Sequence, residues 1–572
     1  MNVSKQHRDD LLEKIRQIRT FIASAPQDTN TGNLLQYLDE ITKDVKGKKY
    51  GLVFEQHREQ IDEILDTHTP VLTEEKDLFI DNGGEMNFLI EGDNLAALKL
   101  LEKTHKGKID VIYIDPPYNT GNKDFVYDDS FVDSNDTFRH SKWLSFMEKR
   151  LNIAKELLSK RGVIFISIDD NEQSQLKLLC DEVLGENNFV AKFDWRKKTG
   201  ANDAKDIAVI TESIILYSKN KPVSIENKIW NRDDLSINKE RYKYSDEFVQ
   251  ERGKFYYDTL DRGGLQYSDS MNFGIEAPDG GIIFPNGRDT FVNDGWIWKW
   301  GKEKIKWGIE HKFLEFVKSN KSKGSSYTIK YKVYQYVDNE GKIREKFGRA
   351  YSNLITDPIN QQGNEELKSL FAKNQIPFSN PKPLGLLRYL LKTTKTNSST
   401  ILDFFAGSGT TGHAVMKLNA EDGGHRKFIL CTNNENNICR DVTYERLKTV
   451  ITGKRKDGSD YNEKYDASLK YYKIDFVPIS DKMYYEYADE LLLHIRELVE
   501  LENGINFNGN TEIAIVLSDE EMEQFVNQKD NKAKVLYRGH DVLLDAQQEA
   551  YLRDNGIKVN VIPDYYYNEL NR

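Results

Sequence analysis

A carboxylate, two prolines and a tyrosine stand together at Asp115-Pro116-Pro117-Tyr118. They directly follow residues 109–114, a short apolar and β-branched run that predicts a buried strand. Because two successive prolines cannot donate to a sheet ladder, the chain should leave the sheet rigidly at the carboxyl end of this strand, where open α/β sheets bind ligands. The Asp115 carboxylate and the Pro116 carbonyl accept hydrogen bonds, and Tyr118 offers a flat face. This set suits a planar ring that bears an exocyclic amino group.

A second stretch with chemical potential is rich in glycine and lies much later in the chain. Residues 399–415 have the pattern of a strand, a glycine turn and a helix. Gly407 and Gly409 permit positive φ and let backbone approach a ligand closely, and Thr410 or Thr411 is expected to cap the helix. The turn and its flanks contain Asp403, Phe405, Ala406, Gly407, Ser408, Gly409 and Thr410.

Two other kinds of ligand site have glycine spacings like those of this turn. Gly412 follows Gly409 with the spacing of a dinucleotide fingerprint, and Gly407 and Gly412 have the spacing of a phosphate-binding P-loop. The P-loop also requires Lys and then Ser or Thr, where this chain has His413 and Ala414. Asp403 at the strand end would repel a pyrophosphate. An acidic strand end instead suits a cationic group such as an ammonium or a sulfonium.

With both stretches present, the chain resembles the amino-group DNA methyltransferases that use S-adenosyl-L-methionine. The order of the two motifs, with Asp115–Tyr118 before Phe405–Gly409, is that of the β class of this family. Residues 119–122 and 125–129 look like the modification subunits of Type III restriction–modification systems. The resemblance implies S-adenosyl-L-methionine as cofactor, double-stranded DNA as substrate and a possible separate restriction subunit.

Three further residues are candidates for cofactor contacts. In the family, a Gly-Asp pair such as Gly92-Asp93 lies beside the adenosine, although Asp93 or Asn94 could simply cap a helix. The family motif before the cofactor loop matches Pro381-Lys382-Pro383, so Lys382 would contact the cofactor carboxylate, unless it is an ordinary solvated lysine. Glu435 follows the next strand and is placed to hold ribose hydroxyls, whereas Glu445 is expected on a helix surface.

Composition limits the possible classes of protein. The 572 residues contain 38% hydrophobic and 30% charged residues and no long apolar run, so we expect neither a membrane span nor a leader peptide. The three cysteines form no Cys-x-x-Cys pair, which suits the cytoplasm and predicts no metal site. The net charge of −11 lies mostly in residues 471–572, which carry 10 Lys/Arg against 20 Asp/Glu. Local basic segments must therefore meet DNA.

Alternation of strand and helix patterns predicts an α/β fold with a doubly wound, mostly parallel sheet. Its expected helices include residues 137–161 and 385–394, and its strands include 162–168, 212–217 and 428–432. Asp169 and Asp170 follow one strand, where acids favour the start of a helix, although an active-site role stays open.

Five regions are expected along the chain. Residues 1–75 are helical, residues 76–220 and 376–475 are the two parts of the methyltransferase core, and residues 476–572 form an acidic α/β domain for dimer or subunit contacts. This last domain should begin with one periodic helix over 480–502. Residues 221–375 are predicted to form the target-recognition domain. Residues 221–350 hold five of the seven tryptophans and 24 Lys/Arg against 20 Asp/Glu, although an ordinary insertion with an aromatic core would look similar.

The predicted activity is methyl transfer to the N6 amino group of adenine in duplex DNA after base flipping. The residues alone also admit cytosine N4, and a stand-alone enzyme without a restriction partner. A nucleotide-binding NTPase or dehydrogenase and a non-catalytic DNA-binding module are the rival classes. A complete restriction enzyme is disfavoured, because the sequence shows no motor-type nucleotide motif.

Overall fold

The computed structural model describes residues 3–24, 31, 34–35, 37–38, 41–42, 54–121, 125–127, 130–133, 135–200, 206–233, 238–264, 266–344, 348–371, 378–479 and 484–567. Within them the chain divides into two compact units, Trp230–Tyr351 and the residues on either side of it. Expectations for residues 122, 128, 129, 376 and 377 lie outside the described residues. Among the described helices, none is long and apolar enough to cross a membrane.

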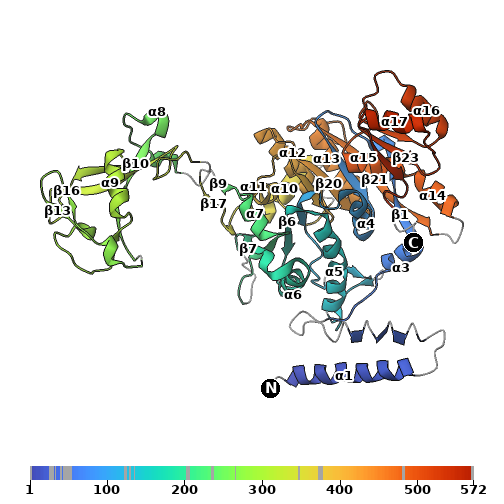
Figure 1. Cartoon of the computed structure of the whole chain (residues 1–572), viewed down its shortest axis with the longest axis horizontal. Coiled ribbons are helices and arrows are strands. Elements are labelled where there is room, and N and C mark those ends of the chain that lie inside the picture. Colours follow the sequence, from blue (N-terminus) through green and yellow to red (C-terminus); the bar gives the residue numbers. More distant parts are fainter. Residues whose placement is uncertain are drawn as a thin grey trace. The chain divides into compact units, whose positions relative to one another are not determined.

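The larger unit is built on a ten-stranded sheet of order β1-β21-β2-β20-β19-β3-β6-β8-β7-β18. Figure 1 labels β1, β6, β7, β20 and β21 of this sheet. Its strands are β1 (His68–Glu74), β2 (Glu85–Glu91), β3 (Ile109–Ile114), β6 (Leu158–Ile168), β7 (Phe189–Arg196), β8 (Thr211–Ser218), β18 (Leu354–Ile355), β19 (Thr400–Asp403), β20 (Lys427–Thr432) and β21 (Ala467–Pro478). The strands from β21 to β6 run parallel, whereas β1 and β8 are antiparallel to their neighbours. The predicted mostly parallel α/β sheet is confirmed.

Helices cover both faces of this sheet. Along β3, Ile112 and Ile114 belong to one core cluster with α4 (Asn94–His105), α5 (Arg139–Leu157) and α6 (Gln173–Cys180). Val111 and Tyr113 point to the opposite face and are equally buried, as period-two alternation requires. On that face Gly412 of α12 (Thr410–Asp422) lies against Phe428 and Leu430. The double winding therefore follows from strands that are apolar on both sides.

Several expected elements differ in the structure. The helix predicted over 137–161 ends at Leu157, and β6 begins at the next residue. Residues 68–74, expected to be helical, are strand β1, and the strand β21 that pairs with it was not predicted. Pro70 is tolerated in β1 because this strand is an edge of the sheet.

The helix predicted over 480–502 is two helices, α14 (Tyr484–Leu492) and α15 (Ile495–Asn503). His494 stands between them, and its ring nitrogen Nδ1 lies 3.0 Å from the Leu72 carbonyl oxygen of β1. This tertiary contact interrupts a pattern that is periodic in sequence. Beyond it β22 (Ile513–Val516), β23 (Val535–Gly539) and β24 (Lys558–Ile562) form a parallel sheet with α16 (Asp519–Asn527) and α17 (Ala546–Asp554).

The smaller unit, Trp230–Tyr351, has its own aromatic core. Its antiparallel sheet has the order β10 (Phe255–Thr259), β16 (Tyr327–Tyr334) and β15 (Leu314–Lys318). Helix α9 (Lys302–Glu310) precedes β15 in the sequence. Trp298 and Trp300 are buried in this core, whereas Trp296, which alternates with them in the sequence, is half-buried. The unit lies inside the predicted recognition domain, residues 221–375, whose boundaries and role stay predictions.

Remaining described helices and short strands complete the two units. In the larger unit they are α1 (Val3–Ser24), α3 (Gln60–Thr67), α7 (Lys221–Glu226), α10 (Asn360–Leu370), α11 (Leu384–Lys392), α13 (Glu445–Thr452), β4 (Val126–Tyr127) and β5 (Ser130–Phe131). In the smaller unit they are α8 (Val249–Arg252), β9 (Arg232–Asp233), β11 (Asp261–Gly263), β12 (Ile275–Glu276), β13 (Ile282–Ile283), β14 (Trp296–Trp298) and β17 (Arg349–Ala350).

Candidate active site

Two adjacent parallel strands bring the two predicted motifs to one edge of the sheet. Strand β19 pairs with β3 in parallel, with Ile401 opposite Val111 and Leu402 opposite Ile112. Asp115 follows the end of β3, and Asp403 is the last residue of β19. Because parallel strands share their carboxyl edge, the two acids lie at the same edge of the sheet although they are 288 positions apart in sequence.

Asp115 is held by a lysine and a tyrosine. The Lys382 ammonium donates to both carboxylate oxygens, at 2.9 Å to Oδ1 and 2.8 Å to Oδ2. The Tyr118 hydroxyl donates to Oδ1 at 2.8 Å, and Lys382 Nζ is 2.9 Å from the same hydroxyl. The ammonium is also 5.1 Å from the centre of the Tyr118 ring. Three of the residues predicted to act at this site therefore contact one another directly.

A fourth charged group, Glu212, faces the same cluster from β8. Its Oε2 lies 3.3 Å from the Tyr118 hydroxyl and 3.7 Å from Lys382 Nζ, while Lys197 Nζ lies 2.9 Å from Oε1. Sequence reasoning did not single out Glu212 or Lys197. The available signal was an acid at the start of the apolar run Ser213–Tyr217, where a buried carboxylate requires a partner.

These contacts set the ionisation of the cluster. Burial by itself lowers the pKa of Lys382, but the carboxylates of Asp115 and Glu212 outweigh burial and raise this pKa above its ordinary value. Burial raises the pKa of Glu212, and Lys382 and Lys197 more than reverse that effect, so its pKa is lowered. The pKa of Tyr118 is raised by burial and by Asp115. At neutral pH the lysine is thus a cation, Glu212 an anion and the tyrosine a neutral hydroxyl.

The segment after β3 is anchored on α5. The Trp143 indole donates to the Pro117 carbonyl at 2.7 Å, which fixes the proline pair. Asn119 adopts φ 58° and is buried, and its amide donates to Glu172 Oε1 at 2.6 Å. His140 Nδ1 lies 2.6 Å from the same oxygen. Burial raises the pKa of Glu172 to about 8, so this carboxyl group is mostly neutral at pH 7.

Asp403, at the start of the glycine turn, binds groups on both sides of that turn. Asp403 is 2% exposed, and it accepts hydrogen bonds from Thr411 Oγ1 at 2.6 Å and from the Phe405 backbone N–H at 3.0 Å. Burial raises the pKa of Asp403 to about 7. The helix after the turn starts from Gly409 in a left-handed conformation with no side-chain cap. The predicted capping by Thr410 or Thr411 is therefore wrong, because both hydroxyls serve tertiary contacts.

Thr410 and Ser408 are fixed by their contacts with other segments. The Thr410 hydroxyl donates to the Lys382 carbonyl at 3.1 Å, which joins the turn to the lysine segment. The buried Arg446 guanidinium donates to Thr410 Oγ1 at 2.8 Å and lies 3.4 Å from Ser408 Oγ. Burial lowers the pKa of Arg446 to about 10, which leaves it cationic. Glu445, expected on the surface, is buried beside it, because this turn of α13 packs inward.

Two of the remaining cofactor candidates, Asp93 and Glu435, follow the ends of β2 and β20. Asp93 caps α4 by accepting from the N–H groups of Leu95 and Ala96 at 2.7 and 3.2 Å, so the simpler of its two predicted roles is present. Glu435 is exposed three residues beyond the end of β20. Lys382 contacts Asp115, not solvent, so the alternative of an ordinary solvated lysine is wrong.

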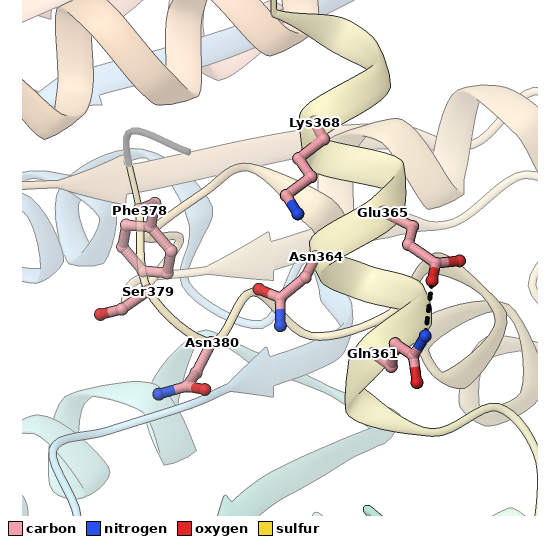
Figure 2. A pocket seen from close by; sticks show the side chains of 7 residues that line it. All are labelled: Gln361, Asn364, Glu365, Lys368, Phe378, Ser379 and Asn380. Carbon is pink, nitrogen blue, oxygen red and sulfur yellow. Dashed lines mark hydrogen bonds between the residues drawn. The ribbon is translucent and has the colours of Figure 1, made fainter. Parts of the chain in front are cut away.

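A pocket of about 600 Å³ lies beside the glycine turn. Figure 2 shows Asn364 and Lys368 of α10 directed toward the segment that carries Phe378 and Asn380. Phe378 reaches the turn, since a Cβ at Gly407 would lie 3.1 Å from its ring. The other lining residues, Gln361, Asn364, Glu365, Lys368, Ser379 and Asn380, are of polar or charged types.

The sequence matches the DNA methylase family over residues 109–445, which include the Asp115–Tyr118 and Phe405–Gly409 motifs. The chain belongs to the DNA methylase family. This membership confirms the resemblance to amino-group DNA methyltransferases that the two motifs indicated.

Three relatives of this DNA methylase agree with the assignment. The Type III restriction-modification enzyme StyLTI Mod subunit of Salmonella typhimurium is 32% identical over 70% of this chain and 62% of its own length. The EcoP15I Mod subunit of Escherichia coli is 31% identical over 66% of this chain and 65% of its own. The Type II methyltransferase M.KpnI of Klebsiella pneumoniae is 30% identical over 68% and 90%. The chain spans less than two thirds of the length of both Mod subunits.

Proposed function

We propose that this DNA methylase transfers a methyl group from S-adenosyl-L-methionine to the N6 amino group of adenine in duplex DNA. The observation that supports this most directly is the pairing of β3 with β19, which puts Asp115 and the Phe405–Gly409 turn at one sheet edge. A target base inside the stack cannot reach that edge, so it must be flipped out at a cost of a few kcal/mol.

Asp115, Pro116, Pro117 and Tyr118 are the proposed catalytic residues. The Asp115 carboxylate and the Pro116 carbonyl would each accept a hydrogen bond from one N–H of the target amino group. These two bonds would direct the lone pair of the amino nitrogen at the methyl group. The main contribution is therefore orientation. Tyr118 would stack on the flipped ring. The Trp143 hydrogen bond to Pro117 holds this acceptor pair in place before the base arrives.

The proposed cofactor residues are those of the glycine turn. S-adenosyl-L-methionine, when bound, supplies the methyl group as a sulfonium. Gly407 and Gly409 have φ of +49° and +74°, and an added Cβ at either would lie 3.1 Å from Phe378 or Thr443, so a side chain at these two positions would be strained. Phe405, Ala406, Ser408 and Thr410 would shape the methionine pocket. Asp403 would face the ammonium, Glu435 the ribose and Asp93 the adenosine.

The names of the relatives support a Type III modification subunit, and M.KpnI supports a stand-alone methyltransferase as the second candidate. The Type III role is proposed first because two Mod subunits match over most of this chain. The Type III role implies a separate restriction subunit as partner. A homodimer, with contacts through the acidic C-terminal domain, is part of the same proposal. Cytosine N4 stays the alternative target, since the same acceptors fit its amino group.

The test is tritium transfer from labelled S-adenosyl-L-methionine to unmethylated genomic DNA, followed by nucleoside analysis. Label in N6-methyladenine is the expected result, and mapping it would identify the recognition sequence. Label in N4-methylcytosine would change the target and keep the mechanism. Absence of both label and cofactor binding would overturn the proposal.

A further inference from the structure

In the resting site the Asp115 carboxylate already accepts three hydrogen bonds. Lys382 Nζ donates to both oxygens, and the Tyr118 hydroxyl donates to one of them. An ammonium N–H and an exocyclic amino N–H are the same kind of donor for a carboxylate. The lysine therefore competes with the proposed target amino group for the Asp115 carboxylate, because its two bonds and the Tyr118 bond already take three of roughly four acceptor sites.

Among the residues that the structure describes, Glu212 is the nearest other carboxylate to this ammonium. Its Oε2 is 3.7 Å from Lys382 Nζ, against 2.8 Å for Asp115 Oδ2, so a movement of about 1 Å would bring the pair to hydrogen-bond distance. The side chain is 7% exposed and its other oxygen is held by Lys197 at 2.9 Å, which keeps it in place. Oε2 also lies 3.3 Å from the Tyr118 hydroxyl, so this hydroxyl can turn from one carboxylate to the other.

We propose that Glu212 is a positioning residue that receives the Lys382 ammonium when a target amino group binds Asp115. The resting site is held closed by the Lys382–Asp115 pair, and entry of the base transfers the lysine to Glu212. Only hydrogen bonds change partners, and no proton or electron moves in this exchange. The inference rests on the proposed methyltransferase function and adds a step to it.

Electrostatics favour this arrangement over a lysine without a second acceptor. Two ammonium groups, Lys382 and Lys197, face two carboxylates, Asp115 and Glu212, so the cluster is balanced in charge. If the buried Lys382 ammonium moved away from Asp115 and met no second carboxylate, its charge would be unpaired, which is costly in a low dielectric. With Glu212 present the ammonium stays compensated throughout the exchange.

The test is a mutant cycle of Glu212→Gln, Lys382→Met and the double variant. Glu212→Gln keeps the shape but removes the charge, so the lysine stays on Asp115. We expect methyl transfer at saturating DNA and cofactor to fall about tenfold or more, the size of one charge-assisted hydrogen bond, with cofactor binding changed less than about twofold. In the Lys382→Met background the same substitution should change the rate less than about twofold, because Glu212 acts through the lysine.

Two controls make the result decisive. Glu212→Asp retains the carboxylate and should recover part of the lost rate, whereas Glu226→Gln removes an exposed acid of α7 and should leave the rate unchanged. Equal losses from Glu212→Gln with and without Lys382 would overturn the inference, as would a Glu212→Gln enzyme of wild-type rate. If the wild-type protein transferred no methyl group to DNA, the proposed function would fail instead.

Discussion

Thr411 Oγ1 donates a hydrogen bond of 2.6 Å to Oδ2 of Asp403, across the glycine turn. The acid at the end of β19 is thereby tied to the first turn of α12, and the Phe405 N–H binds its other oxygen. Since the carboxyl group is buried and its pKa is about 7, its charge changes within the physiological range. We therefore expect the proposed cofactor end of the site to be sensitive to pH.

Cofactor binding should strengthen as the pH rises from 6 to 8. A cationic ligand group prefers the ionised form of Asp403, and with a pKa of about 7 that form increases about tenfold over this interval. Affinity for S-adenosyl-L-methionine, measured by equilibrium dialysis, should rise by up to that factor. Asp403→Asn should bind more weakly and show a flat profile. An identical pH dependence in the variant would assign the titration to another group.

Replacing Asp115 by Asn should abolish most methyl transfer and spare cofactor binding. The amide offers one acceptor where the carboxylate offers two, and it has no charge to compensate the nitrogen that becomes methylated. We expect a loss of at least about a hundredfold in transfer to DNA. Asp110→Asn is the matched control, because this acid lies on the same strand and accepts from Ser159. Loss of cofactor binding with transfer intact would reverse the assigned roles.

Trp143→Phe should make the Pro116–Pro117 segment less well fixed while an aromatic ring still fills the buried position. The substitution keeps an aromatic ring in the buried position and leaves the Pro117 carbonyl without its indole donor. A lost hydrogen bond of this kind costs about 1 kcal/mol, so transfer should fall about fivefold at unchanged cofactor affinity. Trp298→Phe removes the corresponding indole bond to the Phe273 carbonyl in the smaller unit and serves as control for general destabilisation. Cofactor affinity that fell in parallel would argue against a local effect.

Glu172 should make the larger unit less stable as the pH rises. Its pKa is about 8 in the folded protein and about 4.5 when exposed, so the folded state holds a proton that the unfolded state releases between these values. Stability due to this group is full below pH 4.5 and is lost as the pH rises toward 8. Thermal midpoints of wild type and Glu172→Gln, which both retain His140, should diverge over this interval, with the wild type losing more. Parallel midpoints would contradict the assignment.

Local sequence was sufficient to predict the strands β3, β19 and β20 and the turns that follow them. Successive prolines at 116–117 and glycines at 407 and 409 act on the backbone within a few residues, so their effect appears in the sequence. Strand β1 and the break at His494 were missed because both depend on pairing with distant segments.

The sequence by itself determined the chemical groups of the site and the order in which the chain supplies them. Asp115, Tyr118 and the turn from Phe405 to Gly409 are recognisable because both stretches occur in one chain and in the order of the family. Only the tertiary structure decided that Lys382 lies on Asp115 and that Glu212 and Lys197 complete the cluster. These charges come from strands and loops that meet only when the sheet forms, and their ionisation depends on burial, which no local pattern records.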